Sequence, residues 1–507
     1  MVQTDSSDFD PLEHLEKLLN PIGLYAEDTG GKVSIVGEDP LFPSVVRLGT
    51  AFSLSAMAAA VGAAAIWRIR NGKGQNLYID IRQAAHGINP EATFQPTING
   101  YLYPNWMGNF HPFSVFPYKT KDERWVYPSA VYPHQQSHWL NFFDCGPNHK
   151  KIAERIANWN AQELEDTANS QGLTICMART PEEWLKHPQG QYLSREPVIA
   201  IRKIGDSDPE PFKSSERPLG NIKVLSATHA IAGPVVGRTL AEQGAQVLQF
   251  NHPDDFEHDW VYDDANVGFR STYLNLNNPK DNDTAKRLVQ DSDIFVDSYR
   301  GRKITHFGFS PEELAKIRPG IIVVSVRCYG YDGPWAERGG FDMLGSAASG
   351  LAMLEGKNGM PALPPLGLIN DYVTGYMGAA GATAALLKRE KEGGSYHVTL
   401  SLTRNAMWYQ SLGLIPREDL GFASNPYLRI WESSPDELMK DASSIVKRLA
   451  KPEAIIRDTP LGEVRRLAPA VTYSATPAYW NDPILKPRGS DKPEWIQVQK
   501  EQGRQTK

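Results

Sequence analysis

Short apolar runs of strand length alternate with helix-like segments between residues 220 and 410. The β-branched, apolar runs predict strands at 222–227, 245–250, 293–299 and 320–326. Between them, the spacing of apolar positions predicts helices at 233–242, 284–290 and 311–318. Because strands that alternate with helices form parallel sheets with crossover helices, the pattern predicts an α/β fold with a Rossmann-like large domain. The chain has no GxGxxG motif, so no dinucleotide site is predicted.

Two segments rich in Gly and Ala share one layout of helix, Gly-containing turn and strand. The first begins at residue 50 and includes the strand at 76–81, the second runs from 371 to 407, and the two align without a gap at an offset of 321 residues. The pattern alone does not decide whether they are true repeats, because any two such units align passably. The longest apolar stretch, 56–67, is shorter than the roughly 20 residues that a membrane span needs. It predicts a buried helix and no membrane partner.

The composition is that of a folded, water-soluble protein. Of 507 residues, 41% are hydrophobic and 22% charged, which excludes a disordered or fibrous chain. The net charge of -6 offers no general attraction for nucleic acid. Three widely spaced cysteines, and twelve histidines without an HExxH motif, predict neither a disulfide framework nor a metal site. The acidic start lacks the pattern of a signal peptide, so the expected location is cytoplasmic.

Six separated motifs carry a resemblance to a known family. The segment 221–250 combines a strand, an A-G-P turn and a second strand. After it come NVGFRSTYLNL, SDIFVDSYRGRKITHFGF, VVSVRCYGYDGPW, GGFDMLGSAASGL and PPLGLINDYVTG. In this order the motifs resemble the family III CoA-transferases, also called the CaiB/BaiF family. Residues 50–203 resemble the second half of a family member, and residues 460–490 resemble its C-terminus.

The resemblance implies an architecture as well as a class. A Rossmann-like large domain and a smaller α+β domain would be joined by long linkers into a ring, and two such chains would interlock as a homodimer. Here the parts are rearranged or partly duplicated. We predict a truncated copy at 1–203, with a helix–strand unit at about 50–85 and a small domain at about 105–180. A Pro- and Ser-rich linker at 204–219 leads to the core at 220–410, and a C-terminal return segment and tail follow at 411–507.

The resemblance implies that Asp371, in LINDYVTG, is the catalytic nucleophile. Family members use one aspartate to attack an acyl-CoA thioester, which gives an aspartyl anhydride and then an aspartyl-CoA thioester, with no metal and no permanently bound cofactor. A desolvated carboxylate can act in this way, and unpaired N–H groups at the start of a helix would favour its anion. From its position alone, Asp371 could instead be a helix N-cap. The aligned residue of the first copy is Thr50, so we expect at most one catalytic centre per chain.

The resemblance also places a group of residues around coenzyme A. They are Ile231, Ala232, His252, Arg270, Leu274, Asn277, Ser298, Tyr299, Arg300, His306 and Phe341. Arg270 and Arg300 are the best phosphate partners, because a guanidinium group presents a fork of donors; the alternative is a solvated surface arginine. Ile231 stands where the formyl-CoA:oxalate branch has glutamine, which argues against oxalate as the acceptor.

We therefore predict a CoA-transferase that moves CoA from an acyl-CoA, such as succinyl-CoA or another short acyl-CoA, to a carboxylic acid. Two alternatives stay open. The α-methylacyl-CoA racemase branch has a histidine in its G-H-D stretch, where this chain has Phe341. Because Phe341 cannot move a proton, the transferase is favoured. The second alternative is a CoA-binding homologue without catalytic activity, because one of the two copies lacks the aspartate.

Overall fold

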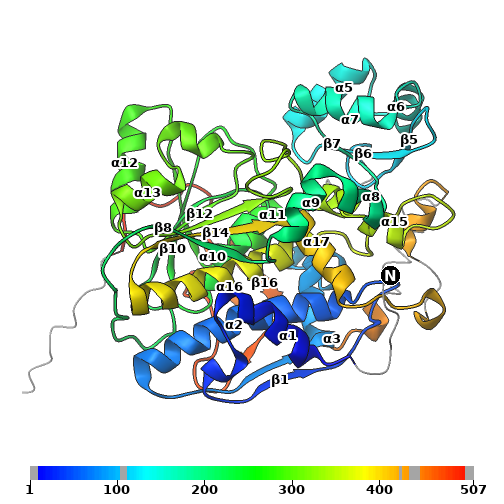
Figure 1. Cartoon of the computed structure of the whole chain (residues 1–507). Helices are drawn as coiled ribbons and strands as arrows, with labels where there is room; N and C mark the ends of the chain where they lie inside the picture. The colour runs from blue at the N-terminus through cyan, green and yellow to red at the C-terminus, as the bar shows by residue number, and fades with distance from the viewer. Residues whose placement is uncertain (1–8, 103–110, 422–424, 433–445, 497–507) are drawn as a thin grey trace, which may run out of the picture.

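The computed structural model describes residues 9–102, 111–421, 425–432 and 446–496. Within these residues, the central sheet has seven strands in the order β11-β10-β9-β12-β13-β14-β8 (Figure 1). The strands from β9 to β14 pair in parallel, and β8 pairs antiparallel with β14. The parallel strands, numbered along the chain, run 3-2-1-4-5-6, the order of a doubly wound sheet. The predicted α/β class with a parallel sheet is confirmed. The strands are β8 (Ala200–Gly205), β9 (Lys223–Ala227), β10 (Gln246–Asn251), β11 (Phe269–Tyr273), β12 (Ile294–Asp297), β13 (Ile322–Arg327) and β14 (Ser395–Ser401).

Alternate residues of each strand enter two separate cores, one on each face of the sheet. Val224 and Ile294 join the core that contains helices α10 and α16, whereas Leu225 and Phe295 join the core under α12 and α13. Because helices cover both faces, the strands are apolar almost throughout, as their sequences predicted. The helices of this part of the chain are α10 (Ala232–Ala241), α11 (Asp259–Ala265), α12 (Pro279–Gln290), α13 (Pro311–Ile317), α14 (Asp342–Ala348), α15 (Leu351–Glu355), α16 (Ile369–Glu392) and α17 (Leu402–Ser411).

The helix α2 (Leu48–Asn71) packs along α16, as the blue and yellow ribbons of Figure 1 show. The first residues of the two helices, and also their last residues, are 321 positions apart, which matches the predicted offset. A Cβ atom on Gly62 would lie 2.0 Å from Oγ1 of Thr383, so the helices approach closely at a glycine. Among the described residues, α2 is the one helix long and apolar enough to cross a membrane, and its apolar window is 100% buried in the protein. The predicted buried helix is confirmed.

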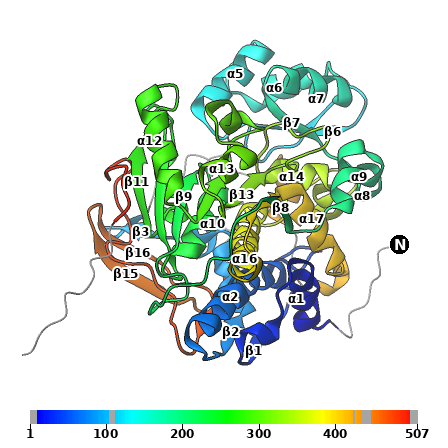
Figure 2. The ribbon, with the colours of Figure 1, turned by 60° about the vertical axis from the view of Figure 1, so that its left-hand side comes forward.

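A small lobe with its own core stands apart from the central sheet, cyan in Figures 1 and 2. Its core gathers around Trp139, which is fully buried. The lobe is built from β5 (Tyr118–Lys119), β6 (Trp125–Ser129), β7 (Thr174–Met177), α5 (Pro133–Phe143), α6 (His149–Ile156) and α7 (Ala161–Ser170). The chain then returns to the central sheet through α8 (Pro181–Lys186), α9 (Pro188–Arg195) and strand β8.

Two smaller sheets join the first and last parts of the chain. In the described residues, one has the order β1-β2-β17 and the other β15-β16-β3-β4. The C-terminal hairpin of β15 and β16 was not among the predicted strands. The strands are β1 (Val33–Val36), β2 (Leu77–Asp80), β3 (Thr97–Ile98), β4 (Tyr101–Leu102), β15 (Ala454–Thr459), β16 (Gly462–Leu467) and β17 (Thr472–Tyr473), and the nearby helices are α1 (Pro11–Leu19), α3 (Ile81–Ala84) and α4 (Pro90–Thr93).

Candidate active site

A cavity of about 700 Å³ lies between the carboxyl ends of the parallel strands and the small lobe. From the sheet it is lined by His229, which follows β9, and by Ser298, which follows β12. From the small lobe it is lined by Tyr132 and Thr174. Ligands of open α/β sheets bind at the carboxyl ends of the strands where the strand order reverses, which here is between β9 and β12. We call this space the central cavity and take it as the candidate site.

Six of the predicted site residues line the central cavity: Ala232, Ser298, Tyr299, Arg300, Phe341 and Asp371. The backbone N–H of His229 donates to Oγ of Ser298 across 3.3 Å, which joins the ends of β9 and β12. Nη1 of Arg300 donates to the carbonyl of Gly172 across 2.7 Å, so this side chain reaches from the sheet to the small lobe. The structure therefore brings the predicted nucleophile and part of the predicted CoA group into one space.

The other predicted CoA residues do not line the central cavity. Nε of Arg270 pairs with Asp491 at 3.2 Å and its Nη1 donates to the carbonyl of Glu494, so the C-terminal segment holds this guanidinium. Asn277 and His306 are exposed, and His252 is half-buried and accepts the N–H of Asp254 across 3.2 Å. The last two, Ile231 and Leu274, are buried in the protein core.

Asp371 lies in the first turn of α16, at the third helical position. The N-cap of this helix is Leu368, so Asp371 is not the N-cap that its position alone allowed. The side chain is 9% exposed and faces the central cavity. Its backbone N–H donates to Oδ2 of Asp342 across 3.0 Å, and the neighbouring Asn370 donates its Nδ2 to Oδ1 of Asp342 across 3.1 Å. Asp342 thus caps the helix that carries the predicted nucleophile.

The pair of carboxylates changes the expected electrostatics. Burial, and after it the negative charge of Asp342, raise the pKa of Asp371 well above its ordinary value of 3.8. Burial also raises the pKa of Asp342, against the hydrogen bonds that it accepts. The expectation that unpaired N–H groups of the helix favour the anion of Asp371 is wrong, because Asp342 already accepts the N–H of that residue. Asp371 therefore ionises at a higher pH than an ordinary aspartate.

The corresponding position of α2 has the same cap but a different side chain. Thr50 is the third residue of α2, as Asp371 is of α16. The backbone N–H and the hydroxyl of Thr50 each donate to Oδ2 of Asp39 across 2.8 Å. Asp39 thus caps α2 as Asp342 caps α16. The nucleophile position of this helix carries a hydroxyl that is already bound, and no carboxylate.

Three residues of the central cavity region escaped the sequence analysis. The hydroxyl of Tyr132 lies 3.0 Å from Nδ1 of His229 and 3.4 Å from each carboxylate oxygen of Glu257. Glu257 also accepts the backbone N–H of Ala230 across 2.7 Å. Burial lowers the pKa of His229 to about 4 and raises that of Glu257 to about 7. The sequence signal that could have found His229 was its place two residues before Ile231 in the same turn.

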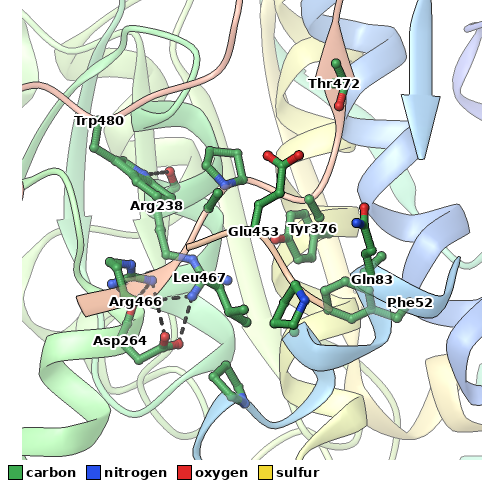
Figure 3. Close-up of a pocket in the computed structure, with 17 residues that line it drawn as sticks. Phe52, Gln83, Arg238, Asp264, Tyr376, Glu453, Arg466, Leu467, Thr472 and Trp480 are labelled. Atoms are coloured by element: carbon green, nitrogen blue, oxygen red, sulfur yellow. Dashed lines mark hydrogen bonds and ion pairs between the residues drawn. The ribbon is translucent and has the colours of Figure 1, made fainter. Parts of the chain in front are cut away.

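Figure 3 shows a second pocket, of about 60 Å³, which shares no lining residue with the central cavity. At one end Asp264 accepts hydrogen bonds from Arg238 across 2.8 Å and from Arg466 across 3.2 Å. Asp264 also accepts a hydrogen bond of 2.8 Å from the hydroxyl of Tyr372, the residue after Asp371. None of the predicted site residues lines this pocket, and its ion cluster holds the first turn of α16 in place.

No cluster of three or more metal-ligating side chains occurs in the part of the chain that the structure describes. Cys328 lines the central cavity but is buried, and burial raises the pKa of its thiol well above the ordinary value. A thiol that stays protonated is a weak nucleophile. The thiol of Cys328 is therefore a poor candidate for a nucleophile in this cavity.

Most of the chain matches one known protein family. Residues 20–208 and 219–421 match the family described as "CoA-transferase family III". Among solved structures, a CAIB/BAIF family protein from Brucella suis is similar at 25% identity and a TM-score of 0.36, over 38% of this chain and 55% of that chain.

Three curated proteins are similar to parts of the chain. The "Acetyl-coenzyme A transferase nodX" of Hypoxylon pulicicidum is 32% identical over 277 residues, which cover 51% of this chain and 46% of that protein. An "Acyl-CoA transferase" of Gibberella moniliformis is 30% identical, over 66% of this chain and 63% of its own length. Human "Succinyl-CoA:glutarate CoA-transferase" is 30% identical, over 40% of this chain and 49% of its own. The chain thus spans between 46% and 63% of the length of these relatives.

Proposed function

The chain belongs to CoA-transferase family III, and on this premise we propose that it moves CoA from an acyl-CoA to a free carboxylic acid, with Asp371 as the nucleophile. The observation that carries the proposal is the position of Asp371: a buried carboxylate on the first turn of α16 that opens into the central cavity. The curated relatives are named as transferases of CoA, and one name pairs succinyl-CoA with glutarate. These names support a carboxylic acid as the acceptor.

The first step is an acyl transfer to Asp371. One carboxylate oxygen attacks the thioester carbonyl, the new C–O bond replaces the C–S bond, and CoA leaves as the thiolate. The CoA thiolate then attacks the aspartyl carbonyl of the mixed anhydride, which releases the donor acid and leaves an aspartyl-CoA thioester. The acceptor carboxylate repeats the two exchanges in reverse. Acyl-CoA and acid are the only reactants, so the reaction needs no permanent cofactor.

Beyond the end of β12, the central cavity carries positive charge that can bind the phosphate groups of CoA. Arg300 and Lys303 both line the cavity beyond the end of β12, next to Ser298 and Tyr299. Burial, and then the positive charge of Arg300, lower the pKa of Lys303. Two neighbouring cations repel each other unless an anion lies between them. A phosphate group of CoA would supply that anion.

Mass spectrometry with hydroxylamine capture tests the proposal. The purified protein is incubated with short acyl-CoAs, and an activated carboxylate is converted to a hydroxamate that peptide mapping locates. We expect the hydroxamate at Asp371 and its loss in Asp371→Asn. Asp259→Asn, at an exposed aspartate in the first turn of α11, is the matched control and should keep the adduct. A modification that persists in Asp371→Asn would refute the assignment.

His229 supports a second candidate function, an α-proton exchange of the racemase type. It is a titratable group in the same cavity as Asp371, whereas Phe341 cannot exchange a proton. Deuterated water distinguishes the two reactions. A racemase incorporates deuterium into a 2-methylacyl-CoA without any acceptor acid, and a CoA-transferase does not.

The family resemblance also supports a homodimer with acyl-CoA and acid as small-molecule partners. Light scattering of the purified chain would measure a mass near twice 56.4 kDa for the dimer. A mass equal to that of one chain at micromolar concentration would refute the homodimer.

A further inference from the structure

A segment near the C-terminus, residues 484–491, runs beside β11 at the edge of the central sheet. The N–H of Gly268 donates to the carbonyl of Ile484 across 2.7 Å, just before the strand begins. The N–H of Asp491 donates to the carbonyl of Ser271 across 2.8 Å, and its carboxylate accepts the N–H of Ser271 across 3.2 Å. These contacts fix the segment on both sides of Arg488.

Arg488 reaches from this segment to the carboxyl ends of β10 and β11. Its Nη1 donates to the carbonyl of Asp255, in the loop that follows β10. Its guanidinium lies 5.8 Å from the ring centroid of Tyr273, the last residue of β11. Asp255 lines the central cavity. Arg488 is thus attached to the rim of this cavity, at the end of the strands where open α/β sheets bind ligands.

The positive charge of Arg488 acts on side chains that line the central cavity. Burial raises the pKa of Tyr132 and of Tyr299, and the charge of Arg488 opposes that rise. Burial lowers the pKa of His229 to about 4, and the charge of Arg488 contributes in the same direction. All three side chains line the cavity. The guanidinium is therefore close enough to influence a charged ligand that crosses the rim.

Arg488 forms no ion pair with a carboxylate among the residues that the structure describes, and its hydrogen bond there goes to a backbone carbonyl. A cation that only neutralised the acidic loop would pair with the carboxylate of Asp254 or Asp255, both exposed at the rim. By contrast, Asp491 already holds Arg270, the cation that the motifs predicted for CoA. Most N–H donors of Arg488 therefore remain available to a ligand.

The same rim carries an exposed aromatic ring beside Asp255. Phe256 is 51% exposed and lines the central cavity. Its ring packs edge-on against Tyr132 and His258, with centroids 6.4 Å and 4.9 Å apart. An aromatic ring near an unpaired guanidinium suits a nucleotide, because the base can stack on the ring while a phosphate binds the cation.

We propose that Arg488 binds the 3′-phosphate of CoA and that the adenine lies against Phe256. The inference rests on the proposed function and assigns a further part of the same ligand. Arg300 and Lys303 follow β12, next to β9 inside the sheet, and suit the diphosphate. Arg488 lies at the edge strand, where the adenosine end of CoA would emerge. A phosphate monoester carries a charge of about −1.5 to −2 at pH 7, and a guanidinium binds it through paired donors.

Isothermal titration calorimetry with CoA and 3′-dephospho-CoA tests the role of Arg488. We expect the wild-type protein to bind CoA about tenfold more tightly than 3′-dephospho-CoA. Arg488→Gln should lose this preference and bind 3′-dephospho-CoA as the wild type does, whereas Arg488→Lys should keep part of it. Arg457→Gln is the matched control and should keep the full preference, because Arg457 pairs with Asp482 at 3.8 Å and does not line the central cavity.

Two outcomes separate this inference from the proposed function. If Arg488→Gln keeps the preference for CoA, or weakens both ligands equally, the role of Arg488 is overturned, while a hydroxamate at Asp371 would still support the transferase. If the wild type neither binds CoA nor forms the hydroxamate, both fail.

Phe256→Ala tests the site of the adenine. We expect CoA and 3′-dephospho-CoA to bind about fivefold more weakly or worse. The binding of 4′-phosphopantetheine, which has no adenosine, should stay unchanged. An equal loss for all three ligands, or no loss for any of them, would overturn the role of Phe256.

Discussion

The backbone N–H of Asp371 donates a 3.0 Å hydrogen bond to Oδ2 of Asp342. This contact fixes the first turn of α16 and places two buried carboxylates next to each other. The negative charge of Asp342 then opposes the ionisation of Asp371. Asp342 thus orients the first turn around Asp371 and is, after burial, the second cause of the raised pKa of Asp371.

Asp342→Asn should move the acid limb of the pH–rate profile to lower pH. The raised pKa of Asp371 means that the reactive anion, and with it kcat/KM, increases as the pH rises through a value well above 3.8. Asparagine can still accept the N–H of Asp371 but carries no charge, so Asp371 becomes easier to ionise. The measurement is kcat/KM between pH 4 and 9 for both proteins. An acid limb at the same pH in both would show that Asp342 does not control the ionisation.

The sequence was sufficient to predict most of the large elements and to single out Asp371, which the structure places at the start of α16, facing the central cavity. The offset of 321 residues predicted the alignment of α2 and α16, and the position of Asp371 followed from one motif. The resemblance of the motifs also predicted that Arg270 contacts CoA. In the structure, Arg270 instead pairs with Asp491. Asp491 lies 221 residues after Arg270 in the sequence, so no local pattern predicts that the two side chains pair.

Thr50→Asp should not create a second catalytic centre. The carboxylate of Asp39 accepts both the hydroxyl and the N–H of Thr50, so an aspartate at position 50 would face it directly. Two unpaired carboxylates in a buried site cost several kcal/mol, on the order of 3–5. We expect a lower melting temperature and no hydroxamate at position 50. Thr50→Ser keeps the hydroxyl and is the control that should melt near the wild type.

Tyr132→Phe should weaken the contact between the small lobe and the sheet. The hydroxyl of Tyr132 contacts His229 and Glu257, which both belong to the other side of the central cavity. A net hydrogen bond contributes about 0.5–1.5 kcal/mol, so KM for the acyl-CoA should rise by about 2- to 13-fold. Tyr127→Phe is the matched control in the same lobe, because the buried hydroxyl of Tyr127 has no hydrogen-bond partner. Equal KM values for all three proteins would exclude this role for Tyr132.

The contacts of Tyr132 also show what the sequence could not predict. Tyr132 and His229 are 97 residues apart; Tyr132 belongs to the small lobe and His229 follows β9 of the central sheet. Neither segment has a pattern that specifies the other, because the contact depends on how the lobe sits on the sheet. The motifs identified the turn after β9, but they gave no signal for Tyr132, which contacts this turn from the small lobe.

Arg179→Met should destabilise the junction between the small lobe and α8. Arg179 and Glu165 form an ion pair of 2.6 Å, with side chains 3% and 0% exposed. Burial alone would raise the pKa of Glu165, but its hydrogen bond and charge attraction to Arg179 outweigh burial and leave that pKa below its ordinary value of 4.5. The pair therefore contributes stability at pH values above about 4.5, and this contribution is lost as the pH falls through the lowered pKa. Without Arg179, the carboxylate of Glu165 stays buried with the backbone N–H of Met177 at 2.7 Å and the guanidinium of Arg338 at 3.6 Å.

The loss of one partner of a buried ion pair costs about 3–5 kcal/mol, whereas the replacement of both partners by apolar residues is often neutral. We therefore expect a clear drop in melting temperature at pH 7 for Arg179→Met and a smaller drop for the double variant Arg179→Met with Glu165→Leu. At pH 4 the single variant should lie closer to the wild type, because Glu165 takes up a proton more readily without Arg179. Thermal melting of the three proteins at both pH values measures this, and a drop for Arg179→Met that is the same at pH 4 and pH 7 would argue against a charge effect.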